Sequence, residues 1–283
     1  MINEFTGRVA VVTGGASGIG LALAESFIAQ GMSVVLADIE RARLESEVTR
    51  LSDDGADVRG LVTDVSDAAS VQRLADFAVA EFGAVHLLCN NAGVESGAAF
   101  LDIPLETWRW VMDVNFFGVL HGMRSFLPIL EDQEQAHIVN TASLSALAAG
   151  APTFGPYVSS KFAILGVSEN LHAELAARQS SVGVSVLAPG PVKTQMSLSE
   201  RNKPSDVPSS AGNAQRAELM AKLNAMVDEV GLEPSAVADM VVDAVRTDRF
   251  FILPHPDKAF EAVRKRLRWM ETNESPGVRH AGD

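Results

Sequence analysis

One tyrosine and one lysine have the spacing that most directly suggests chemistry. Tyr157, the only tyrosine of the chain, and Lys161 are four residues apart, so on a helix their side chains share one face. A phenol has a pKa of about 10 in water, and an ammonium about 4 Å away would lower that pKa toward the range of a useful acid or base. Such pairs also occur on solvated helix faces, so the spacing alone leaves both interpretations open.

A glycine-rich turn near the amino terminus is the second signal. Residues 13–20 read TGGASGIG, after a short apolar run and before a helical pattern. Glycines allow a close approach of the backbone to a ligand, and the free N–H groups of a helix N-terminus suit a pyrophosphate. A purely structural turn is the alternative. The strand before the turn and the helix after it favour a dinucleotide site.

An acid ends the next apolar run. Asp38 lies 18 residues beyond Gly20, where a carboxylate can accept hydrogen bonds from ribose hydroxyls and would repel a 2′-phosphate. This position favours NAD over NADP. Arg41 and Arg43 could instead serve a phosphate, and Asp38 could simply cap the helix that follows.

Short β-branched runs alternate along the chain with longer stretches of helical spacing, such as 19–30, 67–82 and 157–178. The runs lack polar alternation, as is typical of strands that are covered on both faces. The alternation predicts an α/β fold, a doubly wound, seven-stranded parallel sheet with helices on both faces. The predicted strands are Val9–Thr13, Ser33–Ala37, Val58–Val62, Val85–Cys89, His137–Thr141, Val184–Ala188 and Phe250–Leu253.

Two stretches depart from this alternation. Residues 194–215 are rich in Ser, Asn, Pro and Gly and are predicted to form a mobile loop, followed by an apolar stripe over 219–230. The second departure is the tail, in which Phe260, Val263, Leu267 and Met270 form another stripe. We therefore predict one domain, 1–254, with a distinct segment at about 194–230. The extension 255–283 is expected to pack on the body or a subunit interface rather than lie on a membrane.

Composition excludes several classes of protein. The single cysteine, Cys89, rules out a disulfide framework, and 36 acidic against 23 basic residues, a net charge of −13, disfavour nucleic-acid and anionic-membrane binding. No apolar run approaches the ~18 residues of a membrane span, and the N-terminus lacks a basic signal-peptide region, which predicts a cytoplasmic protein. The six histidines show no metal-ligand spacing, so no metal is expected.

Taken together, the motifs resemble the short-chain dehydrogenase/reductase family over residues 8 to about 255. The resemblance rests on the glycine turn, Asp64-Val65, Asn90-Asn91-Ala92-Gly93, Asn115, Ser143, Tyr157 with Lys161, and Pro189-Gly190-Pro191-Val192 with Thr194. It implies an oxidoreductase that moves a hydride between NAD and a secondary alcohol or ketone. It also implies a homo-oligomer, a tetramer or dimer.

The resemblance assigns roles to individual residues. Tyr157 would exchange a proton with the substrate oxygen, and Lys161 would lower the pKa of Tyr157 and bind the nicotinamide ribose. Ser143 would hold the substrate oxygen, and Asn115 would support a water molecule beside Lys161. The implied cofactor-binding residues are Gly14, Ser17, Gly18, Ile19, Gly20, Asp38, Asp64, Val65, Asn91, Ala92, Gly93, Tyr157, Lys161, Pro189, Gly190, Val192 and Thr194.

The substrate is expected to be a fairly bulky, apolar molecule. In the family resembled, the segment after the sixth strand covers the substrate, and the methionines of 219–230 suit that task, although the stripe could also pack on the core. Leu144, Phe154 and residues 150–152 are expected to add to the wall. Glu95 could contact a polar substrate group, but a solvated loop acid is the simpler interpretation. Two alternatives to a ketone reductase stay open. One is a non-catalytic, dinucleotide-binding regulator, and the other is an enzyme of the same fold that reduces imines or enoyl groups.

Overall fold

The strands form one parallel sheet in the part of the chain that the computed structural model describes, residues 2–148, 153–208 and 214–275. Their order across the sheet is β3-β2-β1-β4-β5-β6-β7. The predicted doubly wound, seven-stranded sheet is confirmed for this part of the chain. The strands are β1 Val9–Thr13, β2 Ser33–Asp38, β3 Val58–Val62, β4 Leu87–Asn90, β5 Ala136–Thr141, β6 Val182–Leu187 and β7 Phe251–Ile252.

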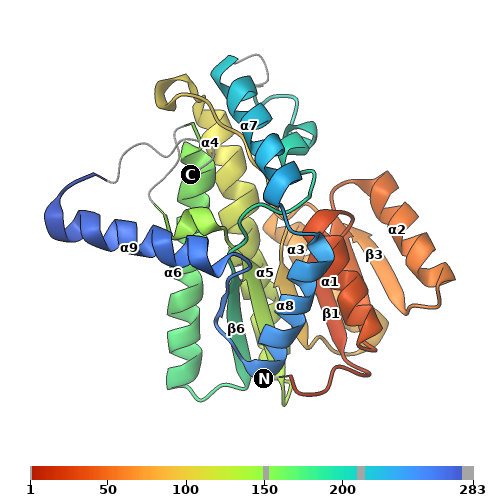
Figure 1. Cartoon of the computed structure of the whole chain (residues 1–283). Coiled ribbons are helices and arrows are strands. Elements are labelled where there is room, and N and C mark those ends of the chain that lie inside the picture. Colours follow the sequence, from red (N-terminus) through yellow and green to blue (C-terminus); the bar gives the residue numbers. More distant parts are fainter. Residues whose placement is uncertain (1, 149–152, 209–213, 276–283) are drawn as a thin grey trace.

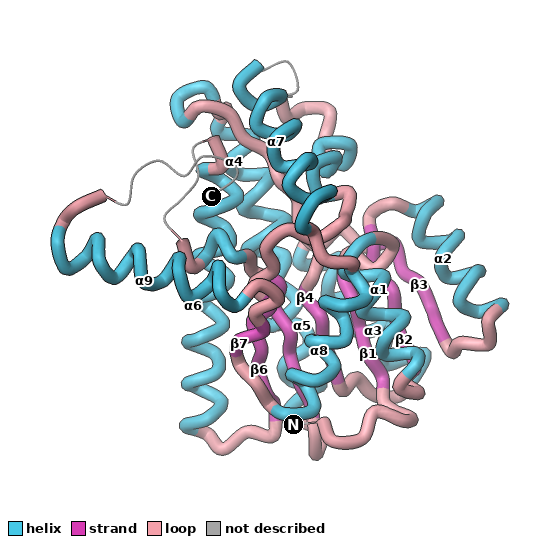
Figure 2. The backbone as a smooth tube through the Cα atoms, viewed as in Figure 1, coloured by secondary structure: helices cyan, strands magenta, loops and turns pink. Residues whose placement is uncertain are grey.

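Helices connect the strands and cover both faces of the sheet (Figure 2). Prolines lie in the first turn of α6, α8 and α9, where an N–H group would have no partner within the helix. The carboxylate of Asp67 caps α3 by accepting hydrogen bonds from the backbone N–H groups of Ala69 and Ser70. The α-helices are α1 Gly18–Ala29, α2 Arg41–Asp53, α3 Ala68–Phe82, α4 Leu105–Met112, α5 Gly118–Glu131, α6 Gly155–Ala177, α7 Ala214–Val230, α8 Pro234–Thr247 and α9 Pro256–Thr272.

Each face of the sheet has its own apolar core. On one face, Leu23 and Phe27 of α1 and Val241 of α8 are buried in one cluster with strand side chains. On the other face, Leu74 of α3 and Phe126 of α5 belong to a second cluster. Burial on both faces explains why the strand sequences are continuously apolar. The sheet is thereby a rigid support for the loops that follow its strands.

Strand boundaries differ from the sequence prediction mainly at two places. β4 begins at Leu87 rather than Val85, and β7 contains only Phe251 and Ile252. β7 is the edge strand and pairs with β6 at only two residue positions. The apolar run in the sequence is therefore longer than the strand that forms. Neither difference moves the carboxyl ends of the central strands.

The segment after β6 is more regular than predicted. Instead of a loop over 194–215, it contains a 3-10 helix, Met196–Asn202, and α7 begins at Ala214. The apolar stripe of α7 is only half-buried and belongs to neither sheet core among the described residues. In Figure 1, α7 lies above α1 and α8, over the end of the sheet where the central strands terminate. The alternative that this stripe packs on the core therefore does not hold for the two sheet cores of the described residues.

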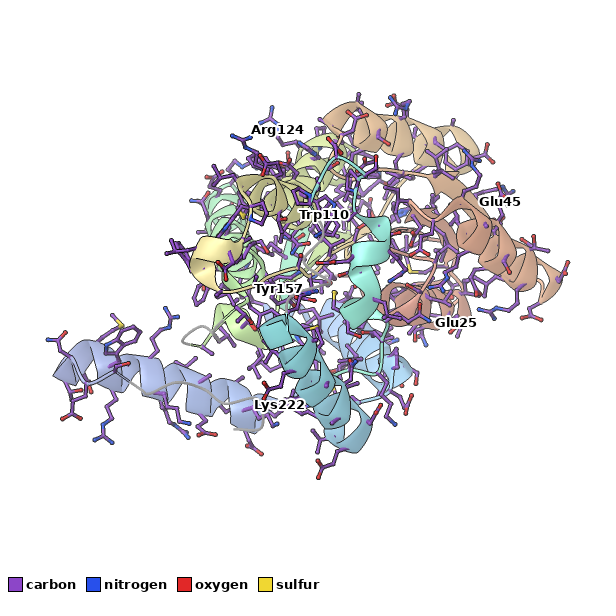
Figure 3. The ribbon with its side chains drawn as sticks, turned by 90° about the horizontal axis from the view of Figure 1, so that it is seen from above. Glu25, Glu45, Trp110, Arg124, Tyr157 and Lys222 are labelled. Atoms are coloured by element: carbon purple, nitrogen blue, oxygen red, sulfur yellow. The ribbon has the colours of Figure 1, made fainter. Side chains whose placement is uncertain are left out.

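α9 extends away from the body, as Figure 1 and Figure 3 both show. Ala259 and Ala262 are buried against the body, and Arg266 donates a hydrogen bond to the carbonyl oxygen of Ala148 (2.9 Å). The stripe of Phe260, Val263, Leu267 and Met270 is exposed. No helix of the described residues is long and apolar enough to cross a membrane.

Candidate active site

The glycine turn lies where the sheet changes its direction of winding. β1 is followed in space by β2 on one side and by β4 on the other, and the carboxyl ends of β1 and β4 are level, with Val12 paired to both Leu36 and Cys89. The connections from these two strands leave on opposite faces, so a crevice opens between them. This crevice is the usual ligand site of doubly wound sheets.

The turn is held tightly against the segment after β4. Gly14 has φ +63° and a Cβ on it would lie 2.9 Å from the Cα of Ala92, while a Cβ on Gly20 would lie 2.0 Å from the carbonyl oxygen of Gly14. The hydroxyl of Thr13 accepts hydrogen bonds from the N–H groups of Asn91 (2.9 Å) and Ala92 (3.1 Å). The sequence therefore needs glycine at Gly14 and Gly20 for backbone packing.

Asp38 fixes the same turn from the other side. One carboxylate oxygen accepts a hydrogen bond from the N–H of Ala16 (3.0 Å), and the other accepts one from the N–H of Glu40 (3.0 Å). Asp38 also lines the cavity that runs along the ends of the strands. Asp38 thus stabilises the local backbone and lines ligand space, whereas it does not cap α2, whose N-cap residue is Glu40. Arg43 donates instead to the side-chain oxygen of Gln195 (2.9 Å).

Lys161 and Asn115 meet at Gly93, the residue after Ala92. A Cβ on Gly93 would lie 3.4 Å from Oδ1 of Asn115 and 3.6 Å from Nζ of Lys161. Asn115 lies in a π-helical turn, Asp113–Phe117, a feature that is frequent at functional sites. Its amide donates to Oγ of Ser160 (2.9 Å), which donates to the carbonyl oxygen of Tyr157 (2.7 Å). The amide of Asn115 thereby fixes the first turn of α6.

Tyr157 projects into the cavity from the first turn of α6, one turn before Lys161. Its hydroxyl forms a hydrogen bond with the side chain of Ser143, which follows the end of β5. Nζ of Lys161 lies 5.6 Å from the centre of the Tyr157 ring and donates to the carbonyl oxygen of Thr141 (2.9 Å). Figure 3 shows Tyr157 and Trp110 toward the centre of the molecule, whereas Glu25, Glu45 and Arg124 lie at its periphery.

Comparison with known proteins gives the same assignment. The family model "short chain dehydrogenase" matches residues 8–205. The chain belongs to the short-chain dehydrogenase/reductase family. It is 38% identical over 251 residues, 88% of this chain and 84% of the relative, to the 1-deoxy-11-beta-hydroxypentalenate dehydrogenase of Streptomyces avermitilis. The CLA biosynthesis dehydrogenase/reductase of Lactiplantibacillus plantarum is 29% identical over 98% of both chains.

A solved structure resembles the whole chain. A short-chain dehydrogenase/reductase of Burkholderia phymatum, crystallised in complex with NAD, has a TM-score of 0.94 at 39% identity and covers 99% of both chains. The structure and these comparisons identify the chain as an oxidoreductase with the Rossmann-like fold of the family.

Most of the residues implied by the family resemblance gather around one cavity. It is lined by Gly14, Ser17, Gly18, Ile19, Asp38, Asp64, Val65, Asn91, Ala92, Gly93, Tyr157, Lys161, Pro189 and Thr194. Gly20, Asn115, Ser143, Gly190 and Val192 are not among the lining residues. Val192 is buried and bridges to Leu232, and Gly190 packs closely on the ring of His255. These two residues support the lining backbone in this structure rather than face the cavity.

The sequence interpretation missed a set of cavity residues. Trp110 and Val94 line the cavity from α4 and from the segment after β4, and Met196 lines it from the 3-10 helix. Arg201 also lines it and donates to the carboxylate of Glu40 (2.9 Å), across the end of the cavity near Asp38. The apolar spacing around Trp110 was the available signal, but it could not show that α4 reaches this cavity.

Neither Phe154 nor Leu144, the described residues expected in the substrate wall, lines the cavity. Phe154 is buried and its ring contacts that of Tyr157 edge-on, with 6.4 Å between ring centres. Leu144 lies in a 3-10 turn directly after Ser143. Residues 150–152 lie outside the described residues. The interpretation of Glu95 as a solvated loop acid is wrong, because only 4% of this side chain is exposed.

The expected lowering of the pKa of Tyr157 by Lys161 is also not seen. Burial raises the pKa of Tyr157 above its usual value, the hydrogen bond from Ser143 opposes this, and the charge of Glu95 adds to it. Burial lowers the pKa of Lys161 to about 7. The spacing argument assumed a solvated ammonium, whereas Lys161 is buried.

The lowered pKa of Lys161 predicts a specific pH dependence of stability. Between the folded pKa of about 7 and the unfolded pKa near 10.5, the unfolded chain binds the additional proton, so the free energy of unfolding rises with pH. Relative to Lys161→Met, the unliganded wild type should gain about 2 kcal/mol between pH 7 and pH 9. Urea unfolding of both proteins at the two pH values measures this difference. An unchanged difference would mean that Lys161 keeps its ordinary pKa.

Proposed function

We propose that this family member interconverts a secondary alcohol and its ketone with NAD as the hydride carrier and Tyr157 as the acid and base. The observation that carries the proposal is that Tyr157 and Lys161 line the same cavity as the glycine turn and Asp38. A proton-transfer group therefore faces one end of a cavity, and the other end has the chemistry to hold a dinucleotide. This arrangement supports turnover over a purely regulatory role.

The residues present fit the dinucleotide. Gly14, Ser17 and Gly18 line the cavity at the N-terminus of α1, where backbone N–H groups suit a pyrophosphate. Asp38 offers a carboxylate to ribose hydroxyls, and its charge opposes a 2′-phosphate. The Burkholderia phymatum relative in complex with NAD supports the same choice.

The protein's own residues act on the substrate oxygen. NAD, when bound, accepts or supplies the hydride. Ser143 and Tyr157 are joined by a hydrogen bond, so both hydroxyls can contact one substrate oxygen. In reduction, the phenol, whose pKa is raised by burial, donates its proton to the developing alkoxide. In oxidation, Tyr157 accepts the alcohol proton, and Lys161, when it carries a proton, would stabilise the phenolate.

The substrate is proposed to be a bulky apolar alcohol or ketone covered by residues 196–230. Val94, Trp110 and Met196 give the cavity apolar walls near Tyr157. The relative from Streptomyces avermitilis is a dehydrogenase of a hydroxypentalenate, which supports oxidation of a hydroxyl group. Among the described residues, α7 belongs to neither sheet core. A helix that opens and closes over a substrate must be able to move without disrupting the core, so this position suits a cover.

The role of Tyr157 predicts a large loss of turnover without a loss of cofactor binding. Tyr157→Phe should lower kcat for alcohol oxidation with NAD by about 10³-fold, because proton transfer is lost. The dissociation constant for NADH, followed by fluorescence, should stay within about twofold. Ser159→Ala, an exposed position on the same helix, is the control and should behave as the wild type. Retention of most activity by Tyr157→Phe would contradict the assignment.

The position of Asp38 predicts the cofactor preference. The wild type should prefer NAD, and Asp38→Asn should raise the NADP-to-NAD ratio of kcat/KM roughly tenfold because charge repulsion is removed. The asparagine oxygen can still accept the hydrogen bond from the N–H of Ala16, whereas the one from the N–H of Glu40 is lost. Asp54→Asn, exposed at the end of α2, should leave the ratio unchanged. Steady-state kinetics with both cofactors decides, and a wild type that prefers NADPH contradicts the proposal.

The exposed stripe of α9 supports a homo-oligomer in which a second copy covers it. Phe260, Val263, Leu267 and Met270 form an apolar strip on a helix that leaves the body, and such strips mark interaction surfaces. Sedimentation velocity should find a dimer or tetramer, and Leu267→Glu should shift it toward monomer. Lys265→Glu, outside the strip, should not. A monomeric wild type would exclude this part of the proposal.

A further inference from the structure

A buried ion pair joins the segment after β4 to the first turn of α7. Nη1 of Arg216 donates to Oε1 of Glu95 (2.7 Å), and Nη2 donates to Oε2 (3.0 Å). The two residues are 4% and 6% exposed. Arginine and glutamate are almost never so buried unless they are paired, and a two-point contact fixes orientation as well as distance. The pair is thus a directional link between two otherwise separate segments.

Further polar contacts extend the pair into a network of three segments. Glu200 of the 3-10 helix lies 3.6 Å from Nε of Arg216 and accepts a hydrogen bond from the hydroxyl of Ser96 (2.6 Å). Lys203 donates to the same carboxylate (3.1 Å). Two acids and two bases therefore balance one another within the network. We call these residues, with Ser199, the lid network.

The lid network is connected to the residues around Tyr157. The hydroxyl of Ser199 accepts a hydrogen bond from the N–H of Glu95 (2.7 Å) and donates to its carbonyl oxygen (2.9 Å). The preceding residue, Val94, exchanges two hydrogen bonds with the side chain of Asn115, which holds the first turn of α6. Hydrogen bonds and one peptide unit therefore lead from the cover to the backbone of Tyr157.

Gly97 adds a second point of contact with the same helix. A Cβ on Gly97 would lie 1.9 Å from the carbonyl oxygen of Thr153, just before α6, and Nη1 of Arg216 lies 3.4 Å from the carbonyl oxygen of Gly97. The segment 94–97 is therefore held between the start of α6 and the first turn of α7. A displacement of Arg216 would release this segment on one side.

We propose that Glu95 and Arg216 are positioning residues that latch the 3-10 helix Met196–Asn202 and α7 onto the segment 94–97 and so define the closed substrate cavity around Tyr157. The catalytic role of this latch rests on the proposed function, whereas the ion pair itself is a property of the fold. Sequence motifs of the family do not include either residue in this chain. Their distance in the sequence, 121 positions, hides the pair from any local pattern.

An ion pair suits a latch better than apolar contacts do. Buried pairs contribute little net stability compared with apolar packing, but they are strongly specific in geometry. When the cover opens, water can hydrate both charges, so neither is left buried and unpaired. The half-buried side chains of α7 could slide over the body, whereas the two-point contact of Arg216 with Glu95 has one register. Closure is then defined and remains reversible, as substrate entry requires.

Hydrogen–deuterium exchange on the full chain, with and without NADH, tests the latch without any need for turnover. Arg216→Met should speed exchange at least tenfold in residues 94–97, 196–203 and 216–230 and leave β1, β4 and β5 unchanged. Glu95→Gln should do the same more weakly. Lys222→Met removes a basic side chain from an exposed pair with Glu218 on the same helix and serves as the control, with no change expected (Figure 3).

Kinetics supply the second readout. With an alcohol substrate, Arg216→Met should raise KM at least tenfold, change kcat less than KM, and keep the NADH dissociation constant within threefold. The double variant Glu95→Gln with Arg216→Met should recover part of the loss, because no unpaired buried charge remains. A merely structural pair would instead lower kcat and NADH binding together.

The outcomes separate the latch from the proposed function. Unchanged exchange in the cover of Arg216→Met overturns the latch, and so does faster exchange throughout the sheet, which would make the pair a general stabiliser. If Arg216→Met does not fold, the same criteria apply to Glu95→Gln. If Arg216→Met speeds exchange only in the cover, and the wild type does not oxidise alcohols, the latch is upheld and the proposed function is overturned.

Discussion

The contact between the glycine turn and the segment after β4 is the constraint on which the site depends. Gly14 lies so close to Ala92 that a side chain at Gly14 would separate the two segments, and the hydroxyl of Thr13 binds both N–H groups on the facing side. This contact closes the base of the crevice at the point where the sheet reverses its winding. The same segment, a few residues later, carries Gly93 and Glu95. One short stretch therefore contacts the glycine turn, the side chains of Asn115 and Lys161, and α7.

Buried charge is concentrated around this stretch. Among the described residues, Glu95, Lys161 and Arg216 are the buried carboxylate, amine and guanidinium, and all three lie on the side of the cavity near Tyr157. Burying charge is costly unless it is paired or neutralised. Glu95 and Arg216 are paired with each other, whereas Lys161 is accommodated by a pKa lowered to about 7 and by the carbonyl oxygen of Thr141. The protein thus tolerates charge only where it serves the site.

Local elements of the fold could be predicted from the sequence. Four continuous apolar residues, Val9–Val12, followed by Thr13 and glycines, define a buried strand and a turn, and both lie where they were predicted. The pairing of Tyr157 with Lys161 on one helix also followed from spacing alone. The effect of Lys161 on the phenol did not follow, because spacing fixes a direction along the helix but carries no information about burial.

The sequence by itself determined the alternation of strands and helices and the glycine turn, because these depend on periodicity and on glycine at positions of close backbone approach. The family and most of the residues that line the cavity followed from the resemblance of the motifs. The tertiary structure alone decided that Glu95 is buried and that Arg216 is its partner. It also decided that Trp110 lines the cavity, and that 196–202 is helical. Each of these depends on a neighbour far away in the chain. The solvation and the ion-pair partner of a side chain depend on the residues that pack against it in the folded protein, and these residues cannot be identified from the local sequence.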